Sequence, residues 1–219
     1  MQRRAFSLSL VGVTAGIAAP AAALAAQAQA PAVPVEGTHY VRLNPPAPTG
    51  AAGKIEVVEF FWYGSPHCSA LEPALEAWRK RLGPDVAFRR VPVALYGDAS
   101  VAQQRLYYAL DALGQLPAMH RRIFYAIHSD RARFDKLPEI AAFMAKNNVD
   151  ATRFNAAYES PAVQAQARQA SLLSDAYKID SVPAFGVQGR YYTSATLAGS
   201  GDKALTVTDF LIARARRGA

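Results

Sequence analysis

The chain has 219 residues, of which 51% are hydrophobic and 19% are charged, and its formal net charge is +7. This composition is typical of a globular protein with one domain, or with one domain that carries a large insertion. Outside residues 1–30 no apolar run reaches the roughly 18 residues that a membrane-spanning helix needs, which excludes a multi-pass membrane protein. Cysteine occurs once, at Cys68, so an internal disulfide is excluded as well.

Residues 1–30 have the pattern of an export signal. Arg3 and Arg4 form a basic start, a mildly apolar stretch continues to Pro20, and small-x-small sites follow at 23–25 and 26–28. The pattern predicts a secretory signal peptide cleaved near residues 25–30, and the arginine pair leaves a twin-arginine route open. A membrane anchor fits less well, because the apolar stretch is weak and broken by proline. Export predicts an oxidising compartment, where disulfide chemistry is possible.

Residues 31–53 form a proline-rich N-terminal segment with five prolines, which predicts a tether or loop with one short strand at 39–43. The basic residues of the remaining chain occur in separated clusters, such as 79–81 and 214–217. Aromatic side chains do not alternate with them as a base-stacking platform requires. We therefore interpret these clusters as solvated helix faces and expect no nucleic-acid partner.

A buried strand followed by a helix is predicted from residue 55. Residues 55–63 are a nearly continuous β-branched and aromatic run, which suits a central strand covered on both faces. After Gly64, Ser65 is a good N-cap and Pro66 a good first helical residue. The apolar positions that follow recur at helical spacing: Leu71, Leu75, Trp78 and Leu82. Cys68 therefore lies on the buried face, near the first turn of this helix.

A second strand and a helical block come next. Gly83 and Pro84 end the first helix, and residues 86–93 are predicted to form a strand. Residues 99–178 are helical in periodicity throughout, with four apolar stripes at 102–113, 119–127, 137–144 and 163–177. A strand–helix–strand order predicts parallel strands, with the polar start of the helix at the carboxyl end of the sheet.

The C-terminal region predicts a hairpin and a last helix. Residues 182–187 and 190–193 are strand-like and flank the turn dipeptide Gln188-Gly189. Thr206 with Asp209 resembles a capping box, which would open the final helix.

Residues 58–68 have the sequence Val-Glu-Phe-Phe-Trp-Tyr-Gly-Ser-Pro-His-Cys. This segment resembles the active-site segment of the DsbA family of exported thiol:disulfide oxidoreductases, which carry Cys-Pro-His-Cys after an apolar strand with an acidic residue. Residues 181–185 resemble the family's loop with a cis proline. The resemblance extends over residues 37–217 and implies an α/β fold, namely a thioredoxin fold with an inserted all-helical subdomain.

This resemblance also implies a domain organisation. The thioredoxin-fold domain would comprise residues 54–98 and 179–219, and the inserted helical domain residues 99–178. The implied activity is thiol:disulfide interchange in the periplasm, without a cofactor. The implied partners are exported polypeptide substrates and a quinone-linked membrane oxidase.

Carried over residue by residue, the motif departs from the family at its first position. Pro66 and His67 correspond to the dipeptide between the two sulfurs, and Cys68 to the second, resolving cysteine. Ser65 stands where the family has its nucleophile. A sulfur at a helix N-terminus has a lowered pKa because N–H groups and the helix dipole stabilise its thiolate. A serine hydroxyl does not ionise at neutral pH and cannot pair with Cys68, so the chain is expected to be redox-defective.

Three interpretations of Ser65 stay open. It replaces a cysteine in an engineered or diverged interchange protein, or it marks a redox-inactive relative that keeps a peptide-binding groove and works as a chaperone. In the third, its hydroxyl binds a thiolate, as in the similar kappa-class glutathione transferases, although the flanking residues favour the DsbA family. The reactivity of Cys68 also stays open, because its first-turn location raises the thiolate fraction and burial lowers it.

By the same resemblance, Glu59 corresponds to a buried acidic residue beneath the motif, and Val182 and Pro183 to a loop that binds the substrate backbone. A carboxylate in an apolar strand is costly unless it is solvated or paired. For Glu59 we favour proton transfer to a buried thiol through water over a salt bridge to a neighbouring strand. A cis Val182–Pro183 bond explains a proline inside a strand-like run better than an edge strand does.

No metal site is expected. His39, His120 and His128 lack partners at metal-ligand spacing, and a single cysteine makes a zinc site a poor interpretation.

Overall fold

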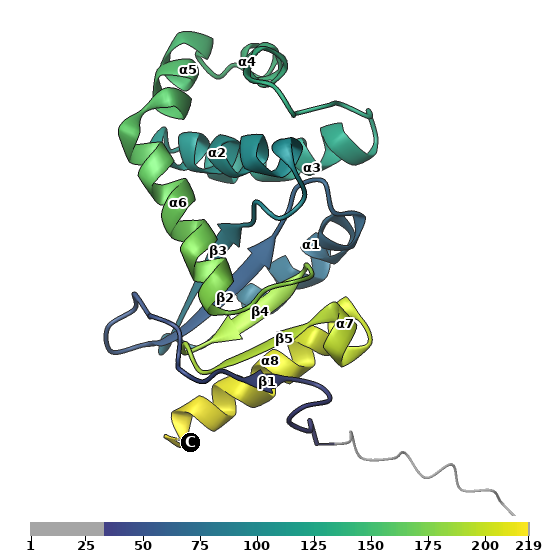
Figure 1. Ribbon diagram of the computed structural model, residues 1–219. Coiled ribbons are helices and arrows are strands. Elements are labelled where there is room, and N and C mark those ends of the chain that lie inside the picture. The colour runs from purple at the N-terminus through teal and green to yellow at the C-terminus, as the bar shows by residue number, and fades with distance from the viewer. Residues whose placement is uncertain (1–32, 219) are drawn as a thin grey trace, which may run out of the picture. The chain divides into compact units, whose positions relative to one another are not determined.

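A five-stranded mixed sheet forms the centre of the fold in the computed structural model, which describes residues 33–218 (Figure 1). The strand order is β1-β5-β4-β2-β3. The strands are β1 Val41–Arg42, β2 Ile55–Phe61, β3 Val86–Pro92, β4 Ala184–Val187 and β5 Tyr191–Ser194. Strands β2 and β3 are parallel, as predicted, whereas β4 is antiparallel to both β2 and β5. The predicted signal peptide at residues 1–30 lies outside the described residues.

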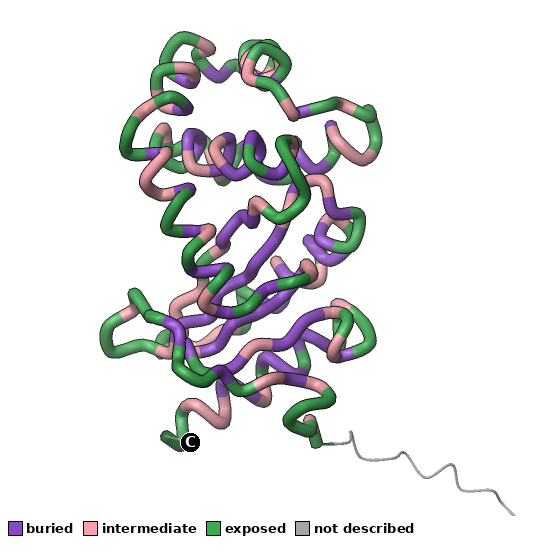
Figure 2. The backbone as a smooth tube through the Cα atoms, viewed as in Figure 1, coloured by how far each residue is buried: buried purple, intermediate pink, exposed green. Residues whose placement is uncertain are grey.

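Alternate side chains of β2 enter two different hydrophobic layers. Val57 packs with Leu75 of α1 (Pro66–Arg79) and Leu211 of α8 (Gly201–Arg216). Val58 and Phe60 point to the other face, where the C-terminal part of α6 (Pro161–Ala176) covers them. Figure 2 shows β2 and β4 buried along nearly their whole length. Coverage on both faces explains why this strand is an almost continuous apolar run.

The helical block consists of α2 (Asp98–Ala112), α3 (Leu116–His128), α4 (Leu137–Lys146), α5 (Ala151–Glu159) and α6. Figure 1 shows α2 to α5 gathered at one end of the sheet, with α6 running from them along the sheet. The sequence predicted four helical stripes here, so α5 was missed as a separate helix. It has two buried anchors, Phe154 and Tyr158, and an N-cap at Asp150.

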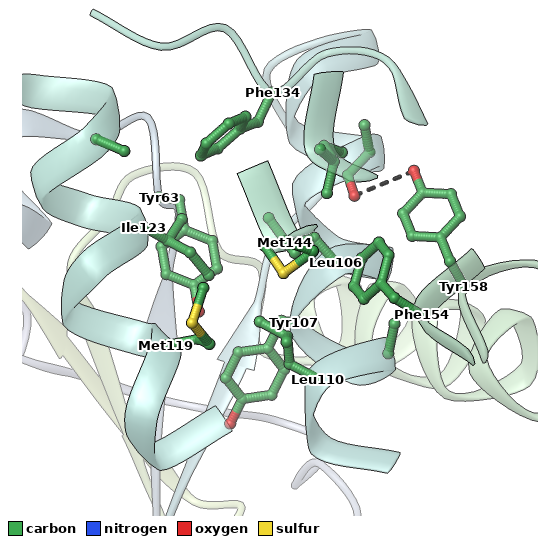
Figure 3. Packing of buried hydrophobic residues seen from close by; sticks show 14 of the residues in the cluster. Tyr63, Leu106, Tyr107, Leu110, Met119, Ile123, Phe134, Met144, Phe154 and Tyr158 are labelled. Carbon is green, nitrogen blue, oxygen red and sulfur yellow. Dashed lines mark hydrogen bonds between the residues drawn. The ribbon is translucent and has the colours of Figure 1, made fainter. Parts of the chain in front are cut away.

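The core of the helical block is continuous with the end of β2. Leu106, Leu110 and Met144 pack together (Figure 3), and the same buried cluster includes Phe61 and Cys68. Tyr63 projects into this cluster beside Ile123 and Met119. The turn that follows β2 is therefore shared between the sheet and the helices.

The last helix begins earlier than predicted. Helix α8 starts at Gly201 with Ser200 as N-cap, because the Ser200 hydroxyl accepts a hydrogen bond from the Lys203 N–H. Thr206 lies inside the helix and its hydroxyl donates to the carbonyl of Asp202. The capping-box interpretation of Thr206 and Asp209 was therefore wrong.

The remaining predictions for the ends of the chain are close to the structure. Gln188 and Gly189 both have positive φ, at 52° and 65°, which is the backbone of a tight hairpin turn. The short strand expected at 39–43 is β1. A four-residue helix, α7 (Ala195–Ala198), follows the hairpin and was not predicted. Within the described residues, none of the helices has both the length and the apolar character needed to cross a membrane.

Candidate functional site

Helix α1 begins at the polar motif, directly after the carboxyl end of β2. Ser65 is the N-cap, and its hydroxyl oxygen accepts a hydrogen bond from the Cys68 N–H at 3.2 Å. Pro66 occupies the first turn, where its missing N–H would have no partner. Ser65 is buried, while Pro66 and His67 are exposed. The residues predicted from sequence are thus adjacent at one helix end, with only the dipeptide facing outward.

Cys68 lies beneath this turn and is 1% exposed. Burial raises the pKa of the Cys68 thiol to about 12, and the hydrogen bond with the Ser65 side chain offsets only part of this effect. The negative charge of Glu59 raises the pKa of Cys68 further. Burial therefore raises the pKa of Cys68 more than its position in the first turn of α1 lowers it, and Cys68 is a thiol at neutral pH.

Glu59 makes the salt bridge that the sequence interpretation ranked second. Its carboxylate accepts a hydrogen bond from Arg90 Nε at 2.9 Å, and Arg90 is its register partner on the neighbouring strand β3. Burial raises the pKa of Glu59 to about 8, because the charge of Arg90 only partly offsets the loss of solvation. The preference for a solvated Glu59 over one paired with a neighbouring strand was therefore wrong, whereas proton transfer to the Cys68 thiol stays a prediction.

Arg90 connects Glu59 to a wider charged cluster on the α1 side of the sheet. Its Nη2 group donates to Glu72 at 3.2 Å and to Glu76 at 2.8 Å. His120 from α3 reaches the same cluster, with Nε2 3.3 Å from the Glu72 carboxylate. Although burial raises the pKa of Glu72, the hydrogen bond from His120 and the charge of Arg90 lower it below its usual range.

A groove of about 480 Å³ opens beside the motif. It is lined on one side by His67, Ala70 and Leu71 of the α1 region, and on the other by Val182 and Pro183. The Val182–Pro183 peptide bond is cis, as predicted. Val182 is half-buried and Pro183 is buried. The two sequence-predicted segments, which lie far apart along the chain, therefore form the walls of one cleft.

Trp62 and Tyr96 form a stacked aromatic pair near the motif that the sequence interpretation did not single out. Their ring centroids are 4.7 Å apart with an interplanar angle of 24°. Tyr96 is 39% exposed, and burial together with the nearby Cys68 raises the pKa of its phenol. Gly64 is required here, because a Cβ at that position would lie 2.3 Å from the Trp62 ring.

Two histidines of α3 contact Tyr63, the residue two positions before Ser65. The Tyr63 hydroxyl is 2.8 Å from His120 Nδ1, and the Tyr63 carbonyl is 2.8 Å from His128 Nε2. The sequence interpretation considered these histidines only as metal ligands. Their spacing of eight residues, two helical turns, could have placed them on one helix face. Within residues 33–218 no group of three or more His, Cys, Asp or Glu side chains could hold a metal ion.

Chemically, the site offers a recessed thiol, a buried hydroxyl and a cleft next to a cis-proline turn. A dithiol couple needs two sulfurs, and Cys68 is the single cysteine of the chain. The cleft itself does not depend on position 65, since the residues that line it are contributed by α1, the Val182–Pro183 turn and the segment 195–202.

Comparison with known proteins gives a consistent family. The family model described as a DSBA-like thioredoxin domain matches residues 56–206. A thiol:disulfide interchange protein DsbA from Bordetella parapertussis is 44% identical over 200 residues, covering 90% of this chain and 95% of the relative. The protein of the same name from Azotobacter vinelandii is 40% identical over 209 residues, covering 95% and 97%.

Solved structures agree with the sequence relatives. The crystal structure of Pseudomonas aeruginosa DsbA matches with a TM-score of 0.80 at 36% identity, covering 84% of this chain and 95% of that one. The oxidoreductase DsbA from Xylella fastidiosa matches with a TM-score of 0.79 at 33% identity, covering 84% and 99%. These structures confirm the predicted thioredoxin-type α/β fold with its helical insert.

Proposed function

The chain belongs to the family of DSBA-like thioredoxin domains. From this premise we propose that it is an exported protein of the periplasm that docks extended polypeptides in the cleft beside Val182 and Pro183. With Ser65 at the position of the family nucleophile, it does not cycle a dithiol. Its relatives are thiol:disulfide interchange proteins. In this proposal the chain has their scaffold but does not carry out one step of their chemistry.

The observation that carries this proposal is the local structure around Ser65. Its oxygen accepts the Cys68 N–H and caps α1, which is a structural task that needs no ionisation. Interchange requires a thiolate that attacks a disulfide and a second thiol that resolves the mixed disulfide. Cys68 is buried and un-ionised at neutral pH, so it serves poorly in the first role, and Ser65 cannot serve in either.

The cleft supports binding of a main chain. One wall is the segment before β4, and the other is the exposed Pro66–His67 turn of α1. An extended segment can lie between these walls and contact Val182, with its side chains directed toward Leu71 and Thr196. We assign exported polypeptides to this cleft as substrates. A quinone-linked membrane oxidase is the partner implied for family members with two cysteines, and Ser65→Cys would be the form that needs it.

A glutathione-dependent reaction of the kappa type is the weaker candidate. It would require the Ser65 hydroxyl to donate to an incoming thiolate at the protein surface. Ser65 is 5% exposed, which leaves little surface where an incoming thiolate could reach its hydroxyl. This burial favours the peptide-docking function over direct use of the hydroxyl.

The redox half of the proposal is tested by measuring dithiol oxidation and insulin reduction for the parent chain, Ser65→Cys and Ser65→Ala. We expect no dithiol activity from the parent chain or from Ser65→Ala. Clear activity is expected from Ser65→Cys, because only this variant has a second sulfur that can form a disulfide with Cys68. Oxidase turnover by the parent chain would contradict the proposal.

The docking half is tested with a cysteine-free model peptide in extended form, measured by titration calorimetry. Ala70→Arg places a long charged side chain in the cleft, whereas Ala77→Arg places the same side chain two turns further along α1, outside it. We expect Ala70→Arg to weaken binding about tenfold or more and Ala77→Arg to leave it unchanged, since a blocked hot spot costs more than about 1.4 kcal/mol. Equal binding by both variants would show that the peptide binds elsewhere.

A further inference from the structure

Tyr63 is held by one face of helix α3. His120, Phe124 and His128 are spaced four residues apart, so they project from the same side of this helix. The Phe124 ring meets the Tyr63 ring edge-on, with centroids 5.0 Å apart. The flanking histidines bond the two ends of Tyr63, His120 its hydroxyl and His128 its carbonyl, each at 2.8 Å. We refer to these three α3 residues as the Tyr63 clamp.

The clamp acts on the turn that carries the motif. Tyr63 immediately follows Trp62, whose carbonyl accepts the Ser65 N–H at 3.0 Å. A restraint on both ends of Tyr63 therefore fixes the backbone from which Ser65 and α1 begin. Since α3 belongs to the helical insert, the clamp is the contact by which the insert positions this turn.

The direction of the hydrogen bonds is set by the neighbours of His120. Glu72 is a carboxylate at neutral pH, because its pKa is lowered, so it accepts a hydrogen bond from His120 Nε2. His120 is 6% exposed and burial lowers its pKa, so the imidazole is neutral and its Nδ1 is free to accept. The Tyr63 hydroxyl, whose pKa is raised by burial, then donates to Nδ1. The two hydrogen bonds therefore have one direction: the Tyr63 hydroxyl donates to His120, and His120 donates to Glu72.

We infer that His120 is a positioning residue for the motif turn, and that adding a proton to its Nδ1 releases Tyr63. The inference rests on the proposed function only in treating residues 62–65 as part of the functional site. A protonated Nδ1 becomes a donor, so the Tyr63 oxygen can only accept from it, and the hydroxyl proton that Nδ1 had accepted is left in a buried position without that acceptor. The bond from His128 to the Tyr63 carbonyl does not involve this proton, because the carbonyl oxygen accepts from His128 Nε2.

Charged and titratable groups face His120 from each element packed around it. They come from the β2–α1 turn, α1, β3 and α2: Tyr63, Glu72, Glu76, Arg90 and Tyr107. The two carboxylates favour the protonated imidazole, while the Arg90 guanidinium and burial oppose it. Because the folded pKa of His120 lies below its unfolded value, the stability that the neutral clamp adds is fully present above the unfolded pKa and is lost as the pH falls through the folded pKa, where Nδ1 takes up its proton.

The test is amide hydrogen exchange of the Ser65 N–H in the full chain from pH 7.5 to pH 4.5, corrected for the intrinsic pH dependence of exchange. We expect corrected exchange to rise about two- to tenfold on acidification, the range of one lost neutral hydrogen bond. The NMR titration of the His120 ring should have the same midpoint. In His120→Gln the acid step should be absent.

Control variants separate this mechanism from general destabilisation. Tyr63→Phe keeps the ring but removes the hydroxyl, so it should also abolish the acid step, and it replaces His120→Gln if that variant does not fold. His128→Gln should raise Ser65 exchange at every pH but keep the step, and His39→Gln should leave both unchanged. A step that persists in both His120→Gln and Tyr63→Phe would overturn the inference. Loss of peptide docking in Ala70→Arg alone would bear only on the proposed function.

Discussion

At position 65, oxygen can replace sulfur with little cost to the fold. The hydroxyl of Ser65 accepts the Cys68 N–H, and a serine at an N-cap stabilises a helix by about 1 kcal/mol relative to alanine. The serine therefore meets the capping requirement of helix α1 without a sulfur atom at this position. The cleft is lined by other residues, so its walls do not depend on whether oxygen or sulfur stands at position 65.

The thiol of Cys68 should react far more slowly in the folded chain than in the unfolded one. A pKa of about 12 instead of the ordinary 9.0 lowers the thiolate fraction by about three orders of magnitude, and burial restricts access as well. Alkylation by iodoacetamide at pH 8, followed by mass spectrometry with and without guanidinium, measures the ratio. A folded-state rate within tenfold of the unfolded rate would contradict the burial of this thiol.

Glu59 should make the folded state less stable as the pH rises. Its pKa is about 8 in the folded chain and near its ordinary 4.5 in the unfolded one. Between these values the folded state holds a proton that the unfolded state has lost, so the free energy of unfolding decreases with pH. We expect Glu59→Gln to gain stability relative to the parent chain from pH 5 to pH 8, by up to a few kcal/mol, in denaturant titrations.

The matched control removes the partner of Glu59 instead. Arg90→Met leaves Glu59 and Glu72 buried without their cation, and breaking a buried ion pair in this way costs about 3–5 kcal/mol. We expect this variant to be strongly destabilised at pH 8 and less so at pH 5, where Glu59 is protonated. A difference between Glu59→Gln and the parent chain that does not change with pH would mean that Glu59 titrates normally.

At the level of elements, the sequence predicts well the features that a few neighbouring residues determine. It predicts poorly the features that depend on packing between distant parts of the chain. Strand β2 and the start of α1 were predicted closely, because a β-branched run and a Ser-Pro cap act within a few residues. Helix α5 was missed because it buries only two side chains of its own. The start of α8 was misplaced because Ser200 and Thr206 are both plausible caps, and packing against the sheet decides between them.

The same distinction applies to the candidate site. Ser65, His67 and Cys68 are neighbours in sequence, so a motif reveals them. The clamp on Tyr63 and the Arg90 ion pairs join residues from different elements, which a single sequence does not bring together. Burial decided the protonation of Cys68, and the depth of a side chain follows from the whole fold and not from its position in one helix.

The contact between β4 and the end of α6 should tolerate no added side chain. A Cβ at Gly186 would lie 2.3 Å from the Tyr177 ring, which is itself fully buried against Phe60. We expect Gly186→Ala to lower the free energy of unfolding by about 1–3 kcal/mol, as overpacking does. In the double variant with Tyr177→Leu the cost of the alanine should largely disappear, and additive costs in denaturant titrations would show that the two residues do not compete for space.

At the level of the whole molecule, the helical insert and the sheet are not independent. Phe61 at the end of β2, Tyr63 in the following turn and Cys68 in α1 are buried in the same cluster as Leu106, Met144 and Phe154 of the insert. Removing the insert would therefore expose the end of the central strand and the turn that carries the motif. Residues Pro34–Ala219 form one compact unit.

This shared core predicts a single cooperative unfolding transition. Both tryptophans, Trp62 and Trp78, lie outside the helical insert, whereas the insert contributes most of the helical signal in far-UV circular dichroism. Fluorescence and circular dichroism should therefore give the same midpoint in guanidinium. Met144→Ala creates a cavity in α4, a helix that contains neither tryptophan, and should lower both midpoints together by the equivalent of about 2–5 kcal/mol. Separate midpoints, or a Met144→Ala shift confined to circular dichroism, would show that the insert unfolds alone and that Tyr63 does not couple it to the sheet.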